Sequence, residues 1–283
     1  MKDICTNICL AGDGWGALAA LHSLSKKFKE ITVVTTDSDV QSFAYVNGFK
    51  EKSNIYDVEA DLYICAGYKP IIAAEFVQNH KIVNIHYSLL PKYRGMHSTV
   101  WAILNNEKKL GLSIHEMNED IDDGPIIDQY SIEYQDETAH DIMVMCNEYT
   151  RTNLGNIICS YLDGRISVSN QNLQEATWVC KRNLDDCIVD FDWEITFLKR
   201  FFKALVLPYP LPRIKVRNEF YEVLSADFIE RDYFMTNGRV VNIDRKGVWI
   251  KVQGGLVILN ELKSIRTGET VSAHNLLKIG ARL

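Results

Sequence analysis

The sequence predicts an α/β protein with a mostly parallel sheet, followed by a small region made only of strands. Over the first 90 residues, short apolar runs rich in Val and Ile alternate with longer patterns of helical period. Such alternation builds right-handed βαβ units whose sheet is covered by helices on both faces, a Rossmann-like arrangement. Beyond residue 210 the pattern changes to short strand-type runs separated by turn residues, which is typical of antiparallel sheets or a partly open barrel.

The individual elements follow from the period of the apolar residues. Strands are expected over residues 7–12, 31–36, 61–67, 81–86, 110–117 and 125–132. Helices are expected over residues 17–24, 71–79, 99–106, 136–163 and 197–206, the last of them stopped by a Pro-rich segment. We therefore expect a main domain with its linking helices over residues 1–210 and a small β domain over residues 211–283.

Charge and composition exclude several classes of protein. The 283 residues include 31 Lys and Arg against 37 Asp and Glu, a net charge of −6, without a dense basic run. Because binding a polyanion requires clustered cations, we do not expect a nucleic-acid partner. The sequence shows no signal-peptide pattern and no apolar stretch near 18 residues, so we expect a cytoplasmic protein without a membrane partner. No CxxC pair occurs, no metal site is expected, and a homodimer is a candidate assembly.

A first candidate site is the turn GDGWGA at residues 12–17, between a predicted strand and a predicted helix. Its spacing fits the GxGxxA form of the dinucleotide fingerprint, and Asp37 ends the next strand, where an acid would bind a ribose hydroxyl. This pattern favours an NAD-dependent oxidoreductase. The alternative is that small residues merely allow a tight strand–helix turn. Gly12, Gly14 and Trp15 also remain candidate contacts for another substrate.

A second candidate site begins at the end of the fourth predicted strand, in the run VNIHYSLLPKYRG at residues 83–95. Asn84 and His86 lie two positions apart, so alternation along the strand places both on one face. In an open α/β sheet the ligand crevice lies beyond the carboxyl ends of the strands. Some 30 residues later, the run SIHEMNEDIDDGPI at residues 113–126 forms an acidic loop that ends in a Gly-Pro turn.

These residue types suit acyl transfer to an amine. An imidazole with a pKa near neutrality can accept the proton that the attacking nitrogen loses. An amide NH2 group or an imidazolium can stabilise the oxyanion of the tetrahedral intermediate, and a carboxylate can orient the imidazole. Singly, each residue has an ordinary structural explanation, since a lone His is more often structural than catalytic and Asn84 could cap a turn. Their combination and order are what indicate a reaction centre.

NIHYSLLPKYRG followed by SIHEMNEDIDDGPII closely resembles the formyltetrahydrofolate-dependent formyltransferase family. That family includes methionyl-tRNA formyltransferase, glycinamide ribonucleotide formyltransferase and the sugar N-formyltransferases. The resemblance covers roughly residues 1–210 and implies that Asn84, His86 and Asp122 form the catalytic trio. Asp122 is preferred to Asp123 because it stands two residues before Gly124, as in the family.

The resemblance also implies the ligands and their contacts. The cosubstrate would be N10-formyltetrahydrofolate, with no metal. Its pterin would be held largely by backbone groups, at residues that we take to be Tyr68, Leu89, Leu90, Pro91, His115, Met117 and Ile121. Arg94 and His97 follow the catalytic strand and would lie near the acceptor, although an ion pair between Arg94 and the acidic loop is an equal alternative for that side chain.

Three features favour a nucleotide-linked amino sugar as the acceptor. The segment after Leu-Leu-Pro reads RGMHS, closer to the R-G-x-H form of the sugar enzymes than to the R-G-A-A-P form of the tRNA enzymes. The chain is also acidic and short for a tRNA enzyme. Its reaction would serve the synthesis of a bacterial surface polysaccharide such as the O-antigen of lipopolysaccharide. Methionyl-tRNA formyltransferase, the oxidoreductase above and an inactive binding module remain alternatives.

Overall fold

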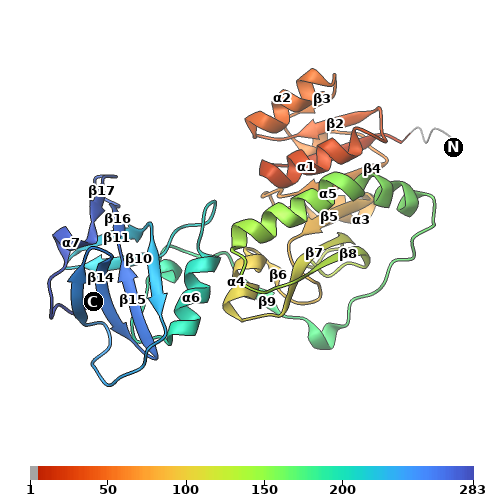
Figure 1. The fold of residues 1–283 in the computed structure, drawn as a ribbon. Helices are drawn as coiled ribbons and strands as arrows, with labels where there is room; N and C mark the ends of the chain where they lie inside the picture. Colours follow the sequence, from red (N-terminus) through yellow and green to blue (C-terminus); the bar gives the residue numbers. More distant parts are fainter. Residues whose placement is uncertain (1–5) are drawn as a thin grey trace. The chain divides into compact units, whose positions relative to one another are not determined.

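The computed structural model describes residues 6–283 (Figure 1). The chain divides into two compact units. The first unit contains most of the chain up to residue 180, and the second contains residues 181–283 with the short segments 103–107 and 136–140. Within residues 6–283, no helix is long and apolar enough to span a membrane.

A seven-stranded sheet in the order β3-β2-β1-β4-β5-β7-β8 forms the centre of the first unit. The first five strands in this order pair in parallel, and β7 alone runs in the opposite direction, pairing antiparallel with both β5 and β8. The predicted mostly parallel sheet is confirmed. The strands are β1 (Ile8–Gly12), β2 (Ile31–Val34), β3 (Lys50–Lys52), β4 (Leu62–Ala66), β5 (Ile82–His86), β7 (Lys109–Glu116) and β8 (Ile126–Glu133).

One face of this sheet is covered by α1 (Gly14–Leu24) and α5 (Ala139–Leu162) (Figure 1). The two helices contact each other directly, because the backbone N–H of Gly155 in α5 donates to the Ser23 hydroxyl of α1 at 3.0 Å. A short α2 (Ser38–Val46) contacts α1 and β3. Of these helices, α1 packs directly against β1 and β4.

The opposite face packs against α3 (Ala74–Asn79), whose Val77 joins a buried cluster with alternate residues of β1 and β4. The helix is shorter than the predicted range 71–79. Two small elements complete the unit: α4 (Ser98–Leu104), and a two-stranded parallel sheet of β6 (Arg94–Gly95) and β9 (Trp178–Val179). Short 3-10 turns occupy Ile55–Asp57, Leu173–Glu175 and Asp185–Cys187, the last of which belongs to the second unit.

The strand order places a switch point at β1, which has β2 on one side and β4 on the other. Ligand crevices in such sheets form beyond the carboxyl ends of the strands near this point. Gly12 ends β1 and His86 ends β5, so both candidate sites found in the sequence lie at the carboxyl edge.

The second unit contains α6 (Ile195–Ala204), a short α7 (Ala273–Leu276) and two four-stranded antiparallel sheets, β10-β11-β16-β17 and β12-β15-β14-β13. This confirms the predicted all-β character of the carboxy-terminal region. The strands are β10 (Arg213–Val216), β11 (Glu219–Val223), β12 (Ala226–Ile229), β13 (Val240–Asp244), β14 (Gly247–Val252), β15 (Gly255–Leu259), β16 (Glu261–Ser264) and β17 (Thr270–Ser272).

Close packing of β1 against β4 generates the first testable prediction. A Cβ at Gly12 would overlap the backbone carbonyl of Ala66, whereas Gly48 has a positive φ of 71° but open space around it. We expect Gly12→Ala to lower the free energy of unfolding by about 2–3 kcal/mol through overpacking. The control Gly48→Ala should lose about 1 kcal/mol from backbone strain alone. Urea denaturation measures both, and equal losses would contradict this account of Gly12.

Candidate active site

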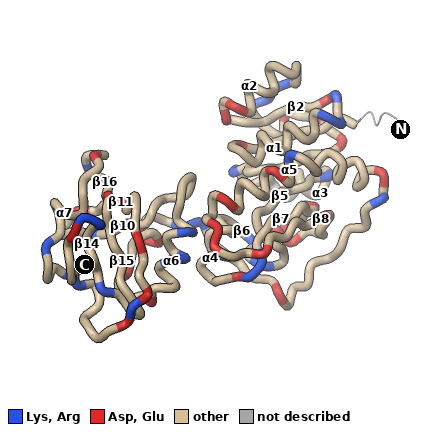
Figure 2. Tube along the Cα trace, in the orientation of Figure 1, with Lys and Arg blue, Asp and Glu red and all other residues tan. Residues whose placement is uncertain are grey.

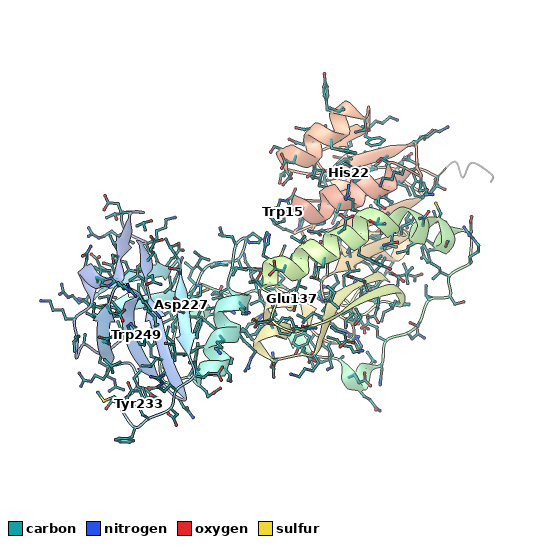
Figure 3. The ribbon with its side chains drawn as sticks, in the orientation of Figure 1. Trp15, His22, Glu137, Asp227, Tyr233 and Trp249 are labelled. Carbon is teal, nitrogen blue, oxygen red and sulfur yellow. The ribbon has the colours of Figure 1, made fainter. Side chains whose placement is uncertain are left out.

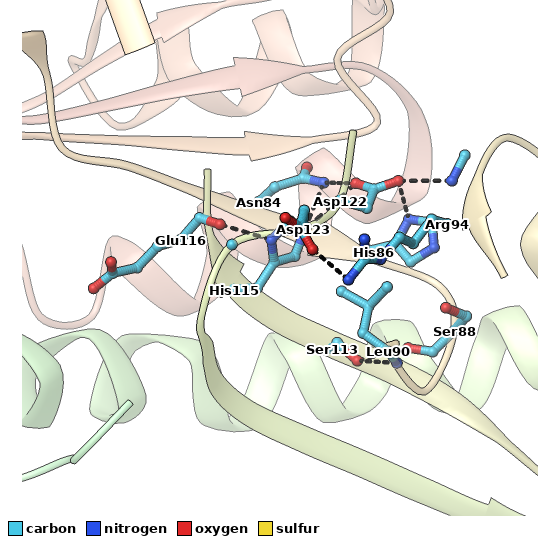
Figure 4. A network of polar contacts seen from close by, with 12 residues as sticks. Asn84, His86, Ser88, Leu90, Arg94, Ser113, His115, Glu116, Asp122 and Asp123 are labelled. Atoms are coloured by element: carbon cyan, nitrogen blue, oxygen red, sulfur yellow. Dashed lines mark hydrogen bonds and ion pairs between the residues drawn. The ribbon is translucent and has the colours of Figure 1, made fainter. Parts of the chain in front are cut away.

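Asn84 and His86 are brought to the site by β5, whose antiparallel pairing with β7 sets Asn84 opposite His115. The Asn84 Nδ2 atom lies 3.2 Å from the Nε2 atom of His115 and donates to the Oδ1 atom of Asp122, also at 3.2 Å (Figure 4). His86 is 7% exposed, and its Nδ1 atom lies 3.4 Å from the Oδ2 atom of Asp122. The structure therefore brings the three predicted catalytic residues together.

Asp122 belongs to the acidic loop between β7 and β8, at a residue with a positive φ of 51°. Its Oδ2 atom accepts a hydrogen bond of 2.8 Å from the backbone N–H of Gly95 (Figure 4). Its Oδ1 atom lies 3.5 Å from the Nε2 atom of His115. Burial by itself would raise the pKa of Asp122, but its contacts with His115, His86 and the Gly95 N–H outweigh burial and lower the pKa to about 2. Asp122 is thus ionised at neutral pH.

Burial has the opposite effect on His86, because it disfavours the charged imidazolium and lowers the pKa. The Asp122 carboxylate and the Tyr93 carbonyl partly offset this effect. The Nε2 atom lies 2.8 Å from the Tyr93 carbonyl oxygen, which can only accept, so the proton of the neutral ring sits on Nε2. The unprotonated Nδ1 atom therefore faces Asp122.

His115, one of the predicted folate contacts, orients Asn84. Its Nδ1 atom lies 2.7 Å from the Glu116 carbonyl oxygen and donates to it, so Nε2 is left as an acceptor for the amide of Asn84. Both N–H bonds of the Asn84 side chain are consequently directed at protein groups, one at His115 and one at Asp122.

Arg94, predicted as a substrate contact, is 3% exposed and forms an ion pair with Asp123. Its guanidinium also donates to the Oε1 atom of Gln171 at 2.8 Å. The Nε2 atom of Gln171 in turn donates to the backbone oxygens of Asp122 and Gly124, each at 2.8 Å. Of the two alternatives left open by the sequence, the observed contacts of Arg94 are those of an ion pair that braces the acidic loop.

Gln171 had no signal in the sequence, because it lies in an irregular segment with no recognisable motif. Asp123, the neighbour to which Asp122 was preferred, lies against Arg94 with its side chain only 20% exposed. Burying the guanidinium requires a carboxylate partner, which explains why this acid does not point into water.

The loop after β5 contains three of the predicted folate contacts, Leu89, Leu90 and Pro91. Leu90 is buried, with its N–H donating to the Ser113 hydroxyl at 3.0 Å (Figure 4) and its carbonyl accepting from Gln129 at 2.9 Å. The Leu90–Pro91 peptide bond is cis. These contacts fix the loop backbone beside the reaction centre, with the Leu90 side chain turned into the core.

The remaining predicted folate contacts fall in two environments. Tyr68 and Met117 are partly buried and pack against the core cluster under β1 and β4. Ile121, next to Asp122, is 68% exposed. Tyr68 follows the carboxyl end of β4, whereas Met117 lies beside Ile82 at the start of β5, with its N–H donating to the Ile82 carbonyl at 2.8 Å. Ile121 lies at the exposed side of the loop.

The glycine-rich turn at the start of α1 is surrounded by carboxylates. The Gly14 N–H donates to Asp37 at 3.1 Å, and Asp13 accepts from the Thr36 N–H at 2.7 Å. Burial would raise the pKa of Asp13, but the hydrogen bonds from Thr36 and Thr35 and the charge of Lys69 lower it. Because a dinucleotide pyrophosphate would need this helix terminus, the negative charge there disfavours the NAD interpretation.

Trp15 lies 51% exposed at the first turn of α1 (Figure 3) and lines an apolar cavity of about 300 Å³ between α1 and α5. The other lining residues are Leu18, Ala19, His22, Val144, Asn147, Glu148 and Arg151. His97, the last predicted substrate contact, is half-buried with a positive φ of 61°, and its carbonyl accepts from the Trp101 N–H in α4. Over the described part of the chain, no group of three or more His, Cys, Asp or Glu side chains could hold a metal ion.

The acidic start of α1 predicts that the protein does not bind nicotinamide dinucleotides. Calorimetric titration with NAD and with NADP should show no binding tighter than millimolar, because Asp37 already occupies the Gly14 N–H and repels phosphate. Asp37→Asn, which removes the charge and keeps the shape, is the matched control. A micromolar dissociation constant for the parent protein would revive the oxidoreductase interpretation.

Comparison with known proteins agrees with this geometry. Residues 21–154 match the model of the formyl transferase family, and residues 182–279 match the formyl transferase C-terminal domain. GDP-perosamine N-formyltransferase from Brucella melitensis is 30% identical over 244 residues, which cover 78% of this chain and 93% of that protein. Methionyl-tRNA formyltransferase from Borrelia duttonii is 27% identical over 254 residues, which cover 86% of this chain and 77% of that protein.

Solved structures show the same fold at lower identity. An N-formyltransferase from Helicobacter canadensis, in complex with folinic acid and dTDP-3-aminofucose, matches with a TM-score of 0.71 at 20% identity, covering 89% of this chain and 98% of its own. HypX from Aquifex aeolicus, in complex with tetrahydrofolic acid, matches with a TM-score of 0.69 at 18% identity. That match covers 96% of this chain, which spans about half of HypX, 47% of its length. The chain therefore belongs to the formyl transferase family and is an enzyme of formyl group transfer.

Proposed function

We propose that this enzyme transfers a formyl group from N10-formyltetrahydrofolate to the amine of a nucleotide-linked amino sugar. The observation that carries the proposal is the buried cluster of a neutral His86 and an ionised Asp122 around Asn84. Such a cluster can accept a proton and stabilise the resulting charge, which is what acyl transfer to an amine requires. Both substrates would be soluble metabolites, which suits the expected cytoplasmic location.

His86 is the proposed proton acceptor. Its lowered pKa keeps it neutral at physiological pH, and its Nδ1 atom is the unprotonated nitrogen. When the amine attacks the formyl carbon, Nδ1 takes the proton that the amine loses. The resulting imidazolium then lies 3.4 Å from the Asp122 carboxylate, which stabilises its charge. As the bond between the formyl carbon and N10 breaks, the imidazolium gives this proton to N10, and tetrahydrofolate leaves.

Asn84 is the proposed donor to the formyl oxygen as that oxygen gains negative charge. Because both of its N–H bonds are directed at protein groups, it must release either His115 or Asp122 to reach the substrate. If the Asn84 amide releases His115, its hydrogen bond to Asp122 stays intact. The freed N–H then donates to the formyl oxygen, which gains negative charge, in place of the His115 ring nitrogen. An N–H bond aimed at a developing oxyanion contributes more than one aimed at a neutral acceptor.

The segments that follow the carboxyl ends of β4 and β5 fit a folate donor. Tyr68, after β4, offers partly buried apolar surface for a flat ring system, and the loop from Leu89 to Pro91, after β5, has a fixed backbone. The bound donor supplies the activated formyl group, and the protein supplies its orientation and the proton acceptor.

The acceptor is inferred from charge and from one relative. The Brucella melitensis GDP-perosamine N-formyltransferase is 30% identical to this chain, against 27% for the Borrelia duttonii methionyl-tRNA formyltransferase. A net charge of −6 also favours a small substrate with two phosphates over a tRNA with many. The formylated sugar nucleotide would supply the synthesis of a bacterial surface polysaccharide.

One observation favours methionyl-tRNA as a second candidate acceptor. Residues 181–283 contain 17 Lys and Arg against 13 Asp and Glu, a net charge of +4 within a chain of net −6. Figure 2 shows basic and acidic residues interspersed in this region. Several of these cations are neutralised locally, since Arg213 pairs with Glu222 and Arg266 pairs with Glu219. The remaining charge is small beside that of a tRNA.

A direct competition distinguishes the two acceptors. The enzyme is given N10-formyltetrahydrofolate with GDP-perosamine, dTDP-3-aminofucose and charged methionyl-tRNA, and the products are analysed by mass spectrometry. We expect a mass gain of one formyl group on a sugar nucleotide, and His86→Ala should reduce that turnover by at least about 10²-fold. If the tRNA is formylated and no sugar nucleotide is, the proposed sugar acceptor is wrong, but the proposed roles of Asn84, His86 and Asp122 are unaffected.

The pH dependence of turnover tests the roles of His86 and Asp122. With His86 as base, the acid limb of the kcat profile should lie below the ordinary histidine pKa of about 6.5. Because the Asp122 carboxylate raises the pKa of His86, Asp122→Asn should move this limb to still lower pH while reducing turnover. Asp163→Asn, which removes an exposed carboxylate paired with Arg165, serves as the matched control. A limb that moves to higher pH in Asp122→Asn would contradict the assignment.

A further inference from the structure

Trp178 is a large apolar side chain that the reaction centre leaves in contact with solvent. It is 67% exposed, although it lies in β9, whose partner strand β6 contains Arg94 and Gly95. Gly95 is the residue whose N–H binds the Asp122 carboxylate at 2.8 Å. Single exposed apolar side chains are common in proteins, and Trp178 differs from the others in its place on the strand that pairs with β6, which binds Asp122.

The backbone that holds Trp178 is fixed along its whole length. The Tyr93 N–H donates to the Thr177 hydroxyl and the Arg94 N–H to the Thr177 carbonyl, both at 2.9 Å. On the other side of Trp178, the Cys180 carbonyl accepts from the Trp101 indole at 2.9 Å. The approach is so close that a Cβ at Gly95 would overlap the Val179 carbonyl. The ring is therefore mounted on a rigid segment, and its exposure is not the result of a loose loop.

One face of the indole is already occupied. The Arg94 guanidinium lies 5.6 Å from the ring centroid, within the range of a cation–π contact. Arg94 is itself held by Asp123 and Gln171, so the ring is oriented by a buried and immobile group. The rest of the indole remains open to solvent and is available to a ligand.

Met96 extends this apolar surface. It follows Gly95 directly and is 47% exposed. Trp178 and Met96 thus flank the residue that holds Asp122, one across the strand pair and one along the chain. Ligand sites are commonly lined by such aromatic and apolar side chains beside a few polar groups.

We propose that Trp178 and Met96 form a platform for the sugar ring of the acceptor, an inference that rests on the proposed sugar substrate. The amine must reach His86 and Asp122, and the hexose is the part of the acceptor bonded to that nitrogen. The nucleobase lies a ribose and two phosphates further away. A deoxyhexose presents an apolar C–H face, whose hydrogens are attracted to the negative face of an indole. The platform would contribute to substrate specificity, because its apolar surface can bind a sugar ring but has no charged group that would bind a diphosphate.

Steady-state kinetics of the full chain test the platform with GDP-perosamine and dTDP-3-aminofucose. Trp178→Ala should raise KM for the sugar nucleotide by about tenfold or more, and Trp178→Phe should restore most of the loss, because phenylalanine also has a π face. KM for N10-formyltetrahydrofolate should stay within about twofold of the parent. Tyr45→Ala, which removes an 83% exposed aromatic side chain at the end of α2, is the matched control.

Fluorescence provides a readout that is independent of turnover. Addition of the sugar nucleotide without a formyl donor should quench tryptophan emission in the parent, and Trp178→Phe should lose that quenching while calorimetry still detects binding. An unchanged sugar KM in Trp178→Ala, or an increase confined to the folate KM, would overturn the platform but not the formyl transfer. A parent enzyme that formylates neither sugar nucleotide would overturn the proposed function and the platform with it.

Discussion

The buried carboxylate of Asp122 is the constraint on which the rest of the site depends. Groups from β5, β6 and β7 converge on it: the Asn84 amide, the Gly95 N–H and the rings of His86 and His115. A charged group away from water is tolerated only when hydrogen bonds and opposite charge replace its hydration. That compensation holds its pKa at about 2, and the resulting fixed charge partly offsets the effect of burial on the pKa of the neighbouring His86. The chemistry proposed for this enzyme follows from the placement of one negative charge.

A second layer of contacts keeps that charge in place. Asp122 has a left-handed backbone, which a side chain other than glycine adopts at some cost. Gln171 holds the loop through two backbone oxygens, and Arg94 ties it through Asp123. Buried ion pairs are weak contributors to stability but strongly restrict geometry. Because Arg94 is committed to this brace, the proposed sugar-nucleotide acceptor would have its phosphates bound by other groups.

The two candidate sites found in the sequence differ in how well their motifs predict a function. The glycines at residues 12–16 fit a dinucleotide fingerprint in spacing, yet Gly12 is required for close packing on Ala66 and the Gly14 N–H is occupied by Asp37. The Asn84 and His86 motif, by contrast, leads to a cluster whose geometry suits one reaction. The second motif contains several residues whose side chains can act together in one reaction. The first motif consists mainly of glycines, which have no side chain and can be required by packing alone.

The sequence by itself determined the parallel sheet, the antiparallel region beyond residue 210, and the convergence of Asn84, His86 and Asp122. The first two follow from local periodicity, whereas the third is what the resemblance of a long ordered motif to the formyltransferase family implied. The tertiary structure alone decided the partner of Arg94, the role of Gln171 and the exposure of Trp178 beside the site. These features depend on the pairing of β6 with β9, two strands of two residues each that are far apart in the chain. Strands of two residues are too short to show a periodic pattern of apolar residues in the sequence. Their pairing becomes visible only in the folded chain, where both strands lie beside the acidic loop.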